Sequence, residues 1–284
     1  MSGYPNIKIR KVTGEVVNFS IKKLKKSLKH SGANDAEIDK IIRYILQNLY
    51  DHITSSEIYK MAFEKLREFH SIYASRYKLK KAIYELGPSG FPFERLVATI
   101  LEKEGYQTQI SVIMHGSCVE HEIDVLAEKR QKYYPIECKF HSDDKYICNI
   151  KIPLYIQSRY LDLKNNWEAE KALGAVWIVT NTRFSEDAIK YAKCNNMRLL
   201  SWNYPPKNGL KERINRLGLY PLTTLNLLSD EEKDRLLEND IVLCSELAEN
   251  DYLINKIGIS KTRKQRILNE ITELCHENVA SETK

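Results

Sequence analysis

The chain has 284 residues, of which 43% are hydrophobic and 10% aromatic, and this composition favours a folded protein of two or three domains over a disordered one. No apolar run reaches the ~20 residues of a membrane helix, and the N-terminal stretch MSGYPNIKIRK lacks the apolar core of a signal peptide. The six cysteines form no CxxC pair, so we expect free thiols in a cytoplasmic protein that does not contact a membrane. The net charge of +6 permits nucleic-acid binding without requiring it.

The first region is predicted to be a short hairpin followed by helices. The hairpin turns at Thr13-Gly14, and a helix begins at Ser20 as its N-cap. A second helix is expected over Asp35 to Tyr50, and a third begins after Thr54-Ser55 and runs toward Leu86. Between Lys8 and Lys29 the sequence has many lysines and Arg10 but a single acid, Glu15. This segment is therefore a phosphate-binding surface or a solvated basic face.

The order I-x-K-x-x-G-x-x-x-x-F-S-x-x-K-L, followed by T-S-x-E-I, resembles the ATP-cone domain over roughly the first 85 residues. This domain is a nucleotide-sensing module, so the resemblance implies ATP or dATP as a regulatory ligand. It implies that Lys11 and Lys23 hold phosphates, that Ser20 and Ser55 lie near the nucleotide, and that Arg76 closes the site from the third helix. Because no GxxxxGK[ST] loop occurs, we expect the nucleotide to act as an effector and not as a fuel.

Gly87-Pro88-Ser89-Gly90 is the strongest breaker in the chain and marks a predicted boundary, which gives a first domain over 1–86 and a second over 87–205. After it we expect a helix over Phe91 to Glu104 and a strand over Tyr106 to Met114.

The centre of the second domain is predicted to be a hairpin whose strands run from Glu122 to Glu128 and from Tyr134 to Phe140, joined by the turn 129–132. Alternation places Glu137 and Lys139 on one face. Asp124 lies on the preceding strand, and its neighbours Ile123 and Val125 suit burial on the opposite face. Two carboxylates that meet across a hairpin form a site for Mg²⁺ or Mn²⁺. A lysine beside them can orient or deprotonate a water for phosphodiester cleavage.

Chance is the alternative explanation of this pattern, because 29% of the residues are charged. Against chance, Glu137 and Lys139 lie in an apolar strand, where burying them is costly unless they are paired or bind a metal. A second Glu-x-Lys, at 231–233, lies in a polar helical stretch instead.

The remainder of the second domain predicts a mixed α/β sheet flanked by helices. We expect a helix over Ile150 to Lys164, a strand buried on both faces over Ala175 to Thr180, a helix over Ser185 to Cys194 and a last strand over Arg198 to Trp202.

The ordered set GFPFERLVATILEKEGY, EID, PIECK and GAVWIVTNTRFSEDAIKYAKCNNMRLLSW resembles the Mrr-like restriction endonucleases of the PD-(D/E)xK superfamily, over roughly residues 90–203. The resemblance implies a restriction-endonuclease-like fold with Asp124 and Glu137 as metal ligands and Lys139 as the water-orienting base. It also implies Glu94 as an additional acid and Gln157 as a polar residue near the site.

Zinc is a further alternative, because Cys118-x-x-His121 and Cys138-x-x-His141 have the spacing of ligands. Alternation argues against it, since Cys138 and His141 face opposite sides of a strand. Cys138 is better explained as a small buried apolar side chain.

The region 206–284 is predicted to be helical, with helices over 210–217, 222–228, 230–238, 242–249 and 263–275. The segment 255–261 resembles the turn of a helix-hairpin-helix motif, whose amides grip a DNA phosphate with help from the cations Lys261, Arg263, Lys264 and Arg266. A plain packing unit of two helices explains the segment equally well.

Taken together, the patterns predict a metal-dependent DNA endonuclease that a nucleotide effector regulates. Cleaving both strands needs two active sites, so we expect a homodimer or a larger homo-oligomer. By analogy with the restriction family, its role is defence against foreign DNA. Two alternatives stay open: a nucleotide-responsive DNA-binding regulator with an inactive nuclease fold, and an RNase with the same metal site.

Overall fold

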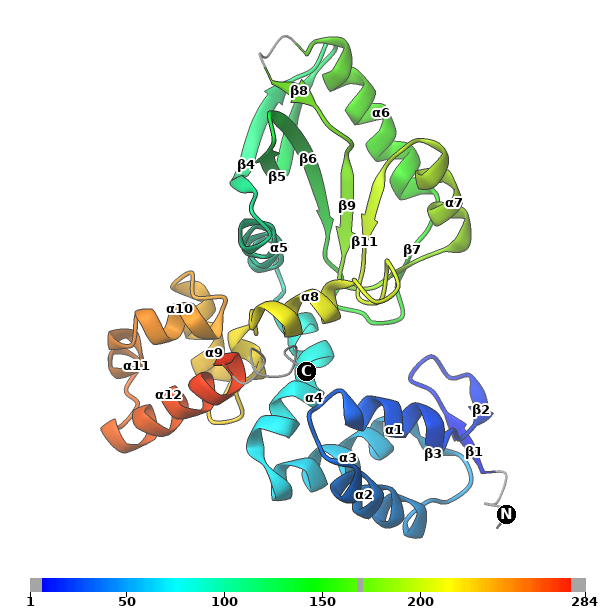
Figure 1. The fold of residues 1–284 in the computed structure, drawn as a ribbon, viewed down its shortest axis with the longest axis vertical. Coiled ribbons are helices and arrows are strands. Elements are labelled where there is room, and N and C mark those ends of the chain that lie inside the picture. Colours follow the sequence, from blue (N-terminus) through cyan, green and yellow to red (C-terminus); the bar gives the residue numbers. More distant parts are fainter. Residues whose placement is uncertain (1–6, 168–170, 277–284) are drawn as a thin grey trace.

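The computed structural model describes residues 7–167 and 171–276, and Figure 1 shows them as three regions. The mixed sheet lies at the top of that view, the N-terminal region at the lower right and the C-terminal helices at the lower left. No helix in the described parts of the chain is long and apolar enough to cross a lipid bilayer.

The N-terminal region packs helices on a small sheet with strand order β2-β1-β3. Its elements are β1 (Lys8–Arg10), β2 (Val16–Asn18), α1 (Ile21–Lys29), α2 (Asp35–Gln47), β3 (Ile53–Thr54), α3 (Ser55–Phe69) and α4 (Ser71–Tyr84). The predicted hairpin and helix starts are confirmed. Ser20 accepts a hydrogen bond from the Lys23 amide at 3.3 Å, and Asn34 and Glu37 form a reciprocal capping box. These caps satisfy amides that have no partner within the helix.

The single long helix predicted from Ser55 toward Leu86 is wrong, because the chain breaks at His70. The backbone there is extended, with φ −151° and ψ 127°. Helix α3 buries Ile58 and Leu66 in the core of the N-terminal region, whereas α4 buries Leu79 and Ile83 in the large core shared with the rest of the molecule. No glycine or proline marks the break, so tertiary packing overrides the local helical pattern.

The central region is a mixed sheet with strand order β11-β9-β6-β5-β4. Its elements are α5 (Phe91–Lys103), β4 (Gln107–His115), β5 (Glu120–Lys129), β6 (Lys132–Lys139), β7 (Ile147–Cys148), α6 (Lys151–Asn165), β8 (Ala172–Leu173), β9 (Trp177–Thr180), β10 (Arg183–Phe184), α7 (Glu186–Cys194) and β11 (Arg198–Leu200). β4, β5 and β6 pair antiparallel, and β6, β9 and β11 pair parallel. The predicted α/β fold with a mixed sheet is confirmed.

Both faces of this sheet are covered, by α5 on one side and by α6 and α7 on the other (Figure 1). In β9, Trp177 and Val179 pack with the α5 core, while Ile178 packs with residues of α6 and α7. The prediction of a strand buried on both faces is therefore confirmed.

The β4–β5 ribbon changes face at Ser111 and Asp124, which would be partners in the register between them. Ser111 has φ +53°, a left-handed conformation that is costly for a residue with a Cβ. Beyond this point Ile123 packs in a small cluster with Leu163 of α6, whereas Val125 packs in the main core beside α5. The expectation that Ile123 and Val125 share one face is wrong, because the strand twists between them.

The C-terminal region is helical, as predicted, with elements α8 (Leu210–Leu217), η1 (Leu222–Thr224), α9 (Asp230–Glu238), α10 (Cys244–Glu249), α11 (Tyr252–Lys256) and α12 (Lys261–His276). The predicted helix over 222–228 is reduced to one 3₁₀ turn. The amide of Leu222 donates to the Val242 carbonyl, and an isolated bridge joins Pro221 to Leu243. These backbone partners from a distant segment replace helical ones.

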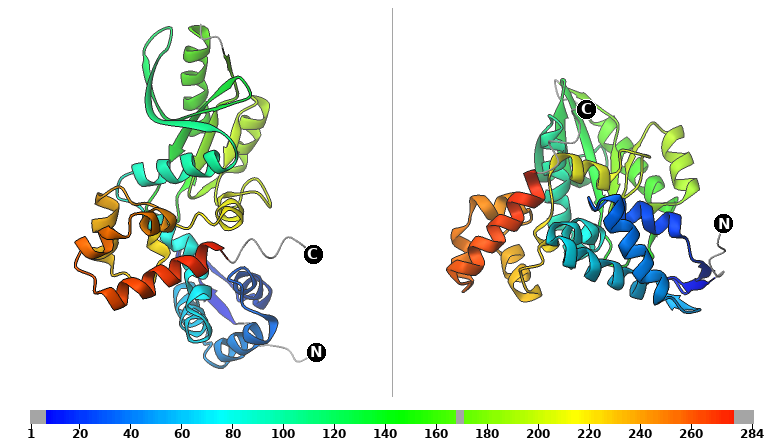
Figure 2. Two further views of the ribbon diagram at one scale, coloured as in Figure 1. Left: turned by 60° about the vertical axis from the view of Figure 1, so that its left-hand side comes forward. Right: turned by 60° about the horizontal axis from the view of Figure 1, so that its bottom comes forward.

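The C-terminal region docks on α4, which lies between it and the other N-terminal helices in both views of Figure 2. Ser75 of α4 donates to the Glu270 carboxylate at 2.9 Å. The side-chain amide of Asn226 donates to the Ser75 hydroxyl at 2.7 Å, and the backbone amide of Asn226 donates to Glu270 at 3.0 Å. One hydrophobic core runs from α4 through the sheet to α12. The divisions at 86/87 and 205/206 therefore stay predictions.

Candidate functional site

Asp124 and Glu137 lie opposite each other where β5 and β6 separate. Val125 and Ile136 are the last residues paired between these strands, and the next position on each strand carries a carboxylate. The Asp124 Oδ2 accepts a hydrogen bond from the Cys138 amide at 2.6 Å. This bond turns the Asp124 carboxylate toward β6, beside Glu137 and Lys139.

Glu137 is almost fully buried, with 6% of its surface exposed, and it is held by two cations. Lys139 Nζ lies 2.5 Å from its Oε1, and Nη1 of Arg159 on α6 lies 2.5 Å from its Oε2. Each oxygen of this carboxylate is therefore paired with one cation. The alternation that places Glu137 and Lys139 on one face agrees with their direct contact.

Glu94 lies in the first turn of α5, folded back on the segment that precedes the helix. A Cβ added at Gly90 would lie 3.3 Å from Glu94 Oε1 and 4.0 Å from the Cβ of Phe140, the residue after β6. A Cβ added at Gly87 would lie 2.7 Å from the Phe140 ring. These glycines let the start of α5 approach the end of β6, which brings Glu94 near the site.

Two of the carboxylates, Glu94 and Asp124, have raised pKa values. Burial, followed by the charges of Asp124 and Glu122, raises the pKa of Glu94 to about 7. Burial and the charge of Glu137 raise the pKa of Asp124 to about 6. Burial alone would lower the pKa of Lys139, but the charge and hydrogen bond of Glu137 raise it overall. The site therefore has excess negative charge beside a lysine that stays protonated at neutral pH.

This oxygen donor set fits a hard divalent cation, which needs one or two protein carboxylates with water and phosphate as its other ligands. Among the described residues, no three or more His, Cys, Asp or Glu side chains form a ready-made metal cage.

Gln157 on α6 has the least support among the predicted site residues. Its Oε1 is buried and has no hydrogen-bond partner among the described residues, and this orphaned acceptor costs about 1–3 kcal/mol.

Arg159 was missed by the sequence analysis, as was the chain of residues that holds it. Its Nη2 donates to the Glu122 carbonyl and its Nε lies 3.5 Å from Nδ1 of His121. His121 Nε2 lies 2.8 Å from Oδ2 of Asp162, and the tautomer that donates from Nε2 to Asp162 presents Nδ1 as the acceptor for Arg159. The sequence signal is the position of Arg159, three residues after buried Ile156 on the inner stripe of α6.

Asp162 is the anchor of this arrangement. Its carboxylate accepts from the Ser117 hydroxyl at 2.8 Å and from the Cys118 amide at 2.9 Å, in the turn between β4 and β5. Hydrogen bonds, first from His121 and then from Ser117, hold the pKa of Asp162 well below its usual range. Helix α6 is thereby fixed to the ribbon that carries Asp124.

The end of β6 is held from β9. The Thr180 hydroxyl donates to the Lys139 carbonyl at 2.7 Å, and Asn181 bonds the His141 backbone in both directions, at 2.7 and 3.0 Å. Both side chains are fully buried. They position the strand that carries Lys139.

The zinc alternative does not fit the arrangement of its proposed ligands. His121 is engaged with Asp162, and Cys138 is buried, which raises its thiol pKa above the usual range. His141 stacks on Tyr146 at 3.7 Å between ring centroids. The four proposed ligands therefore do not converge on one point within the described parts of the chain.

The predicted nucleotide residues are brought together in part. Lys11 pairs with Glu15 at 2.7 Å, and the pKa of Glu15 is lowered first by Lys11, with a smaller effect of Lys23. Ser20 caps the helix that carries Lys23. Arg76 lies elsewhere: a Cβ on Gly32, in the turn after α1, would come within 3.0 Å of its Nη1. The expectation that Arg76 closes the nucleotide site is not supported by this contact.

Ser55 lines a hollow of about 430 Å³ between the N-terminal region and the sheet. Val12, Ser56 and Tyr59 line it from the hairpin and α3, and α4 contributes Lys80, Lys81 and Tyr84. The opposite wall is Ser142, Asp143 and Asp144, in the loop that follows β6. Cations and aromatic rings suit a nucleotide, and this hollow adjoins the strand that carries Lys139.

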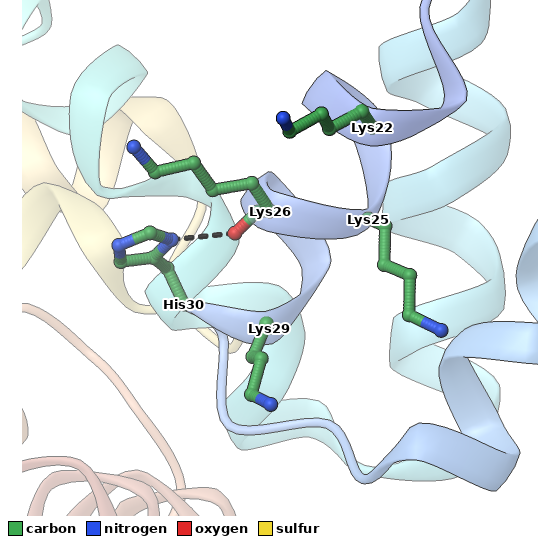
Figure 3. A pocket seen from close by; sticks show the side chains of 5 residues that line it. All are labelled: Lys22, Lys25, Lys26, Lys29 and His30. Atoms are coloured by element: carbon green, nitrogen blue, oxygen red, sulfur yellow. Dashed lines mark hydrogen bonds between the residues drawn. The ribbon is translucent and has the colours of Figure 1, made fainter.

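A second hollow, of about 470 Å³, lies on the outer face of α1 (Figure 3). It is lined by Lys22, Lys25, Lys26, Lys29 and His30, with no acidic side chain among them. Lys25 pairs with Asp39 at 3.2 Å. Burial lowers the pKa of Lys211 on α8, Glu212 raises it, and Lys26 has a smaller lowering effect, which places Lys211 near this surface.

The C-terminal cations are divided by the structure. Arg263 bonds Glu232 at 2.6 Å and also the Leu227 carbonyl, and Lys264 pairs with Asp251 at 2.9 Å. These pairs tie α12 to α9 and to the residue before α11, and the DNA contacts of Arg263 and Lys264 stay predictions. Lys261 and Arg266 are exposed.

Comparisons with known proteins agree with this architecture. Family models match as an ATP cone domain over residues 7–85, a restriction endonuclease over 87–203 and an AF1548-like C-terminal region over 220–275. An uncharacterized protein of Archaeoglobus fulgidus is 37% identical over 175 residues, which are 61% of this chain and 97% of the relative.

A crystal structure titled as the protein of unknown function AF1548 superposes with a TM-score of 0.55 at 34% identity, covering 66% of this chain and 98% of that one. The chain therefore belongs to the family of this Archaeoglobus protein, and it joins an ATP cone domain to an Mrr-type restriction-endonuclease domain and an AF1548-like C-terminal region.

Proposed function

We propose that the protein is a Mg²⁺-dependent DNA endonuclease whose activity a nucleotide regulates. The observation that carries this proposal is the position of Asp124 and Glu137 opposite each other at the end of the β5–β6 pairing, with Glu94 close enough to feel their charge and Lys139 protonated beside them. Such a charge imbalance destabilises a fold unless a ligand neutralises it.

Asp124 and Glu137 would hold the metal, and Mn²⁺ has the same preference for carboxylate oxygens. The bound ion would polarise the scissile phosphate and stabilise the departing oxygen. Lys139, which keeps its proton, orients the attacking water through a hydrogen bond and does not deprotonate it. Glu94 faces the same space and is the carboxylate available to accept the proton of that water.

The cationic surfaces suggest how DNA is held. The face of α1 offers lysines spaced along one side of a helix, with no acid among them, and such a surface suits a phosphate backbone. Lys261 and Arg266 on α12 are the C-terminal cations left for the same purpose. The backbone contacts would position the duplex without reading its sequence.

The deciding experiment incubates the purified protein with supercoiled plasmid and with single-stranded RNA, in Mg²⁺ and in EDTA. We expect Mg²⁺-dependent nicking or linearisation of DNA by the wild type and none by Asp124→Asn. Cleavage of RNA alone would favour the RNase alternative. DNA binding without cleavage in either metal would favour a DNA-binding regulator, an alternative that the double ion pairing of Glu137 supports.

The nucleotide part of the proposal rests on the ATP cone domain and on the hollow that Ser55 lines. ATP or dATP would place its phosphates against Lys80 and Lys81 or against Lys11 and Lys23, and its base against Tyr59 or Tyr84. Calorimetric titration should detect binding, and the variant that weakens it, Lys23→Ala or Lys80→Ala, identifies the lysine pair that holds the phosphates. Melting temperatures unchanged by every nucleotide would remove the sensor role.

Assembly, location and biological role follow from the same proposal. Cutting both strands requires two sites, so we expect a homodimer or larger homo-oligomer in the cytoplasm, acting against foreign DNA. Light scattering with and without duplex DNA measures the assembly.

A further inference from the structure

Both oxygens of Glu137 are paired with cations. Lys139 occupies Oε1 and Arg159 occupies Oε2, each at 2.5 Å, and the Glu137 side chain is only 8% exposed. A divalent cation that binds Glu137 therefore competes with Lys139 and Arg159 for the same two oxygens and is repelled by both cations.

The position of Arg159 is built into the fold. Its guanidinium is held on three sides, by Glu137, by the Glu122 carbonyl and by His121, which Asp162 orients in turn. Only 15% of the Arg159 side chain is exposed, compared with 28% for Lys139. This arrangement holds a cation beside the predicted metal site.

A guanidinium binds carboxylate and phosphate oxygens with the same planar fork of donors. A phosphodiester that enters the site therefore offers Arg159 a partner equivalent to Glu137. A divalent ion that arrives at Asp124 repels Arg159 and attracts the Glu137 oxygen that Arg159 occupies. Each ligand thus favours the same movement of the guanidinium.

We propose that Arg159 exchanges Glu137 for a DNA phosphate when DNA and metal bind together, so that it keeps the metal site closed until substrate is present. This inference rests on the proposed function, because it assigns Asp124 and Glu137 to a metal and the neighbouring space to a phosphodiester. It goes further, since it makes metal and DNA binding mutually dependent. By linkage, each ligand strengthens the affinity for the other by the same factor.

The test measures the affinity for Ca²⁺, which takes the same oxygen ligands as Mg²⁺. Titration calorimetry is performed without DNA and with a short duplex that a gel shows to be uncut. For the wild type we expect Ca²⁺ to bind more tightly when DNA is present. In Arg159→Gln, Ca²⁺ should bind on the order of tenfold more tightly without DNA, and the gain from adding DNA should largely disappear. Lys164→Gln, an exposed cation on the same helix, is the matched control.

Arg159→Lys keeps the charge and covers the case in which Arg159→Gln fails to fold. It should retain part of the mutual dependence, because a lysine lacks the planar fork. If Arg159→Gln or Arg159→Lys bound Ca²⁺ more weakly without DNA, Arg159 would only position Glu137 and the inference would fail. Wild-type protein that binds Ca²⁺ with no effect of DNA would overturn this inference alone. Wild-type protein that binds no divalent ion would overturn the proposed function with it.

Discussion

The C-terminal helices and the nuclease site contain charged side chains in opposite arrangements. In the C-terminal region Arg263 pairs with Glu232 and Lys264 with Asp251. Burial raises the pKa of Glu232, but the hydrogen bonds from Arg263 and Ser229 and the charge of Arg263 together lower it overall. In the nuclease site both available cations lie on Glu137, which leaves Asp124 and Glu94 with raised pKa values. Balanced charges hold helices together, whereas unbalanced charges mark the place of a ligand.

The largest effect is expected from Glu137→Gln, which tests both sides of this contrast at once. Cleavage should fall by about a thousandfold or more, since the metal supplies several kcal/mol of transition-state stabilisation. The free energy of unfolding should also fall by about 2 kcal/mol, because Lys139 and Arg159 lose a partly buried partner. Plasmid cleavage and urea denaturation measure the two effects. Asp124→Asn is the control: it should lose cleavage without losing stability, and equal destabilisation by both variants would contradict the contrast.

The basic face of α1 provides the next largest effect, because its lysines lack acidic partners in the hollow that they line. In the double variant Lys22→Glu and Lys26→Glu, DNA affinity should weaken. The negative slope of log affinity against log salt should become shallower by roughly 0.9 for each phosphate that the variant no longer neutralises. Fluorescence anisotropy over a salt series measures this slope.

The matched control for α1 is Lys190→Glu with Lys193→Glu on α7, which changes the net charge equally at exposed positions of the sheet region. Equal loss of affinity in both double variants would mean that only the overall charge matters, and α1 would then be an ordinary solvated face.

A smaller effect is expected in the C-terminal region from Arg263→Ala. The variant should lose about 1 kcal/mol of stability, since its ion pair with Glu232 is partly exposed. Its DNA affinity and salt slope should stay as in the wild type. Lys261→Ala, at an exposed position two residues earlier, should show the reverse. A shallower salt dependence of DNA affinity in Arg263→Ala would show that this arginine contacts DNA.

The parts of the fold that the sequence predicted are those with local causes. Ser20, Asn34 and Ser185 mark helix starts because their side chains cap nearby amides. The juxtaposition of Asp124 and Glu137 follows from the short turn after Lys129, since a hairpin with a fixed turn has a fixed register.

The parts that the sequence did not predict depend on distant partners. Nothing local shows that the chain breaks at His70, or that Arg263 meets Glu232 across 31 positions. Ser111 has no sequence signal for its positive φ, and it lies at the change of face that separates Ile123 from Val125. Arg159 could have been suspected as a cation on an apolar helix stripe, but only the docking of α6 shows that it contacts Glu137.

The smallest expected effect is a pair of pH dependences with opposite signs. The pKa of Asp124 rises from 3.8 to about 6 on folding, so its ionised form destabilises the protein above pH 6, and this cost fades as the pH falls toward 4. Asp124→Asn should therefore be more stable than the wild type at pH 8, on the order of 1 kcal/mol after allowing for solvent screening, and less so at pH 5.

The pKa of Glu232 is lowered, so the stability that its ionised form contributes is present at neutral pH and is lost as the pH falls through its folded value. Glu232→Gln should accordingly be less stable than the wild type at pH 8, with a difference that shrinks in acid. Thermal unfolding of the three proteins across this range measures both signs. Stability curves of the wild type and Asp124→Asn that run parallel across this pH range would show that ionised Asp124 carries no electrostatic cost, and its carboxylate would then not favour a bound cation.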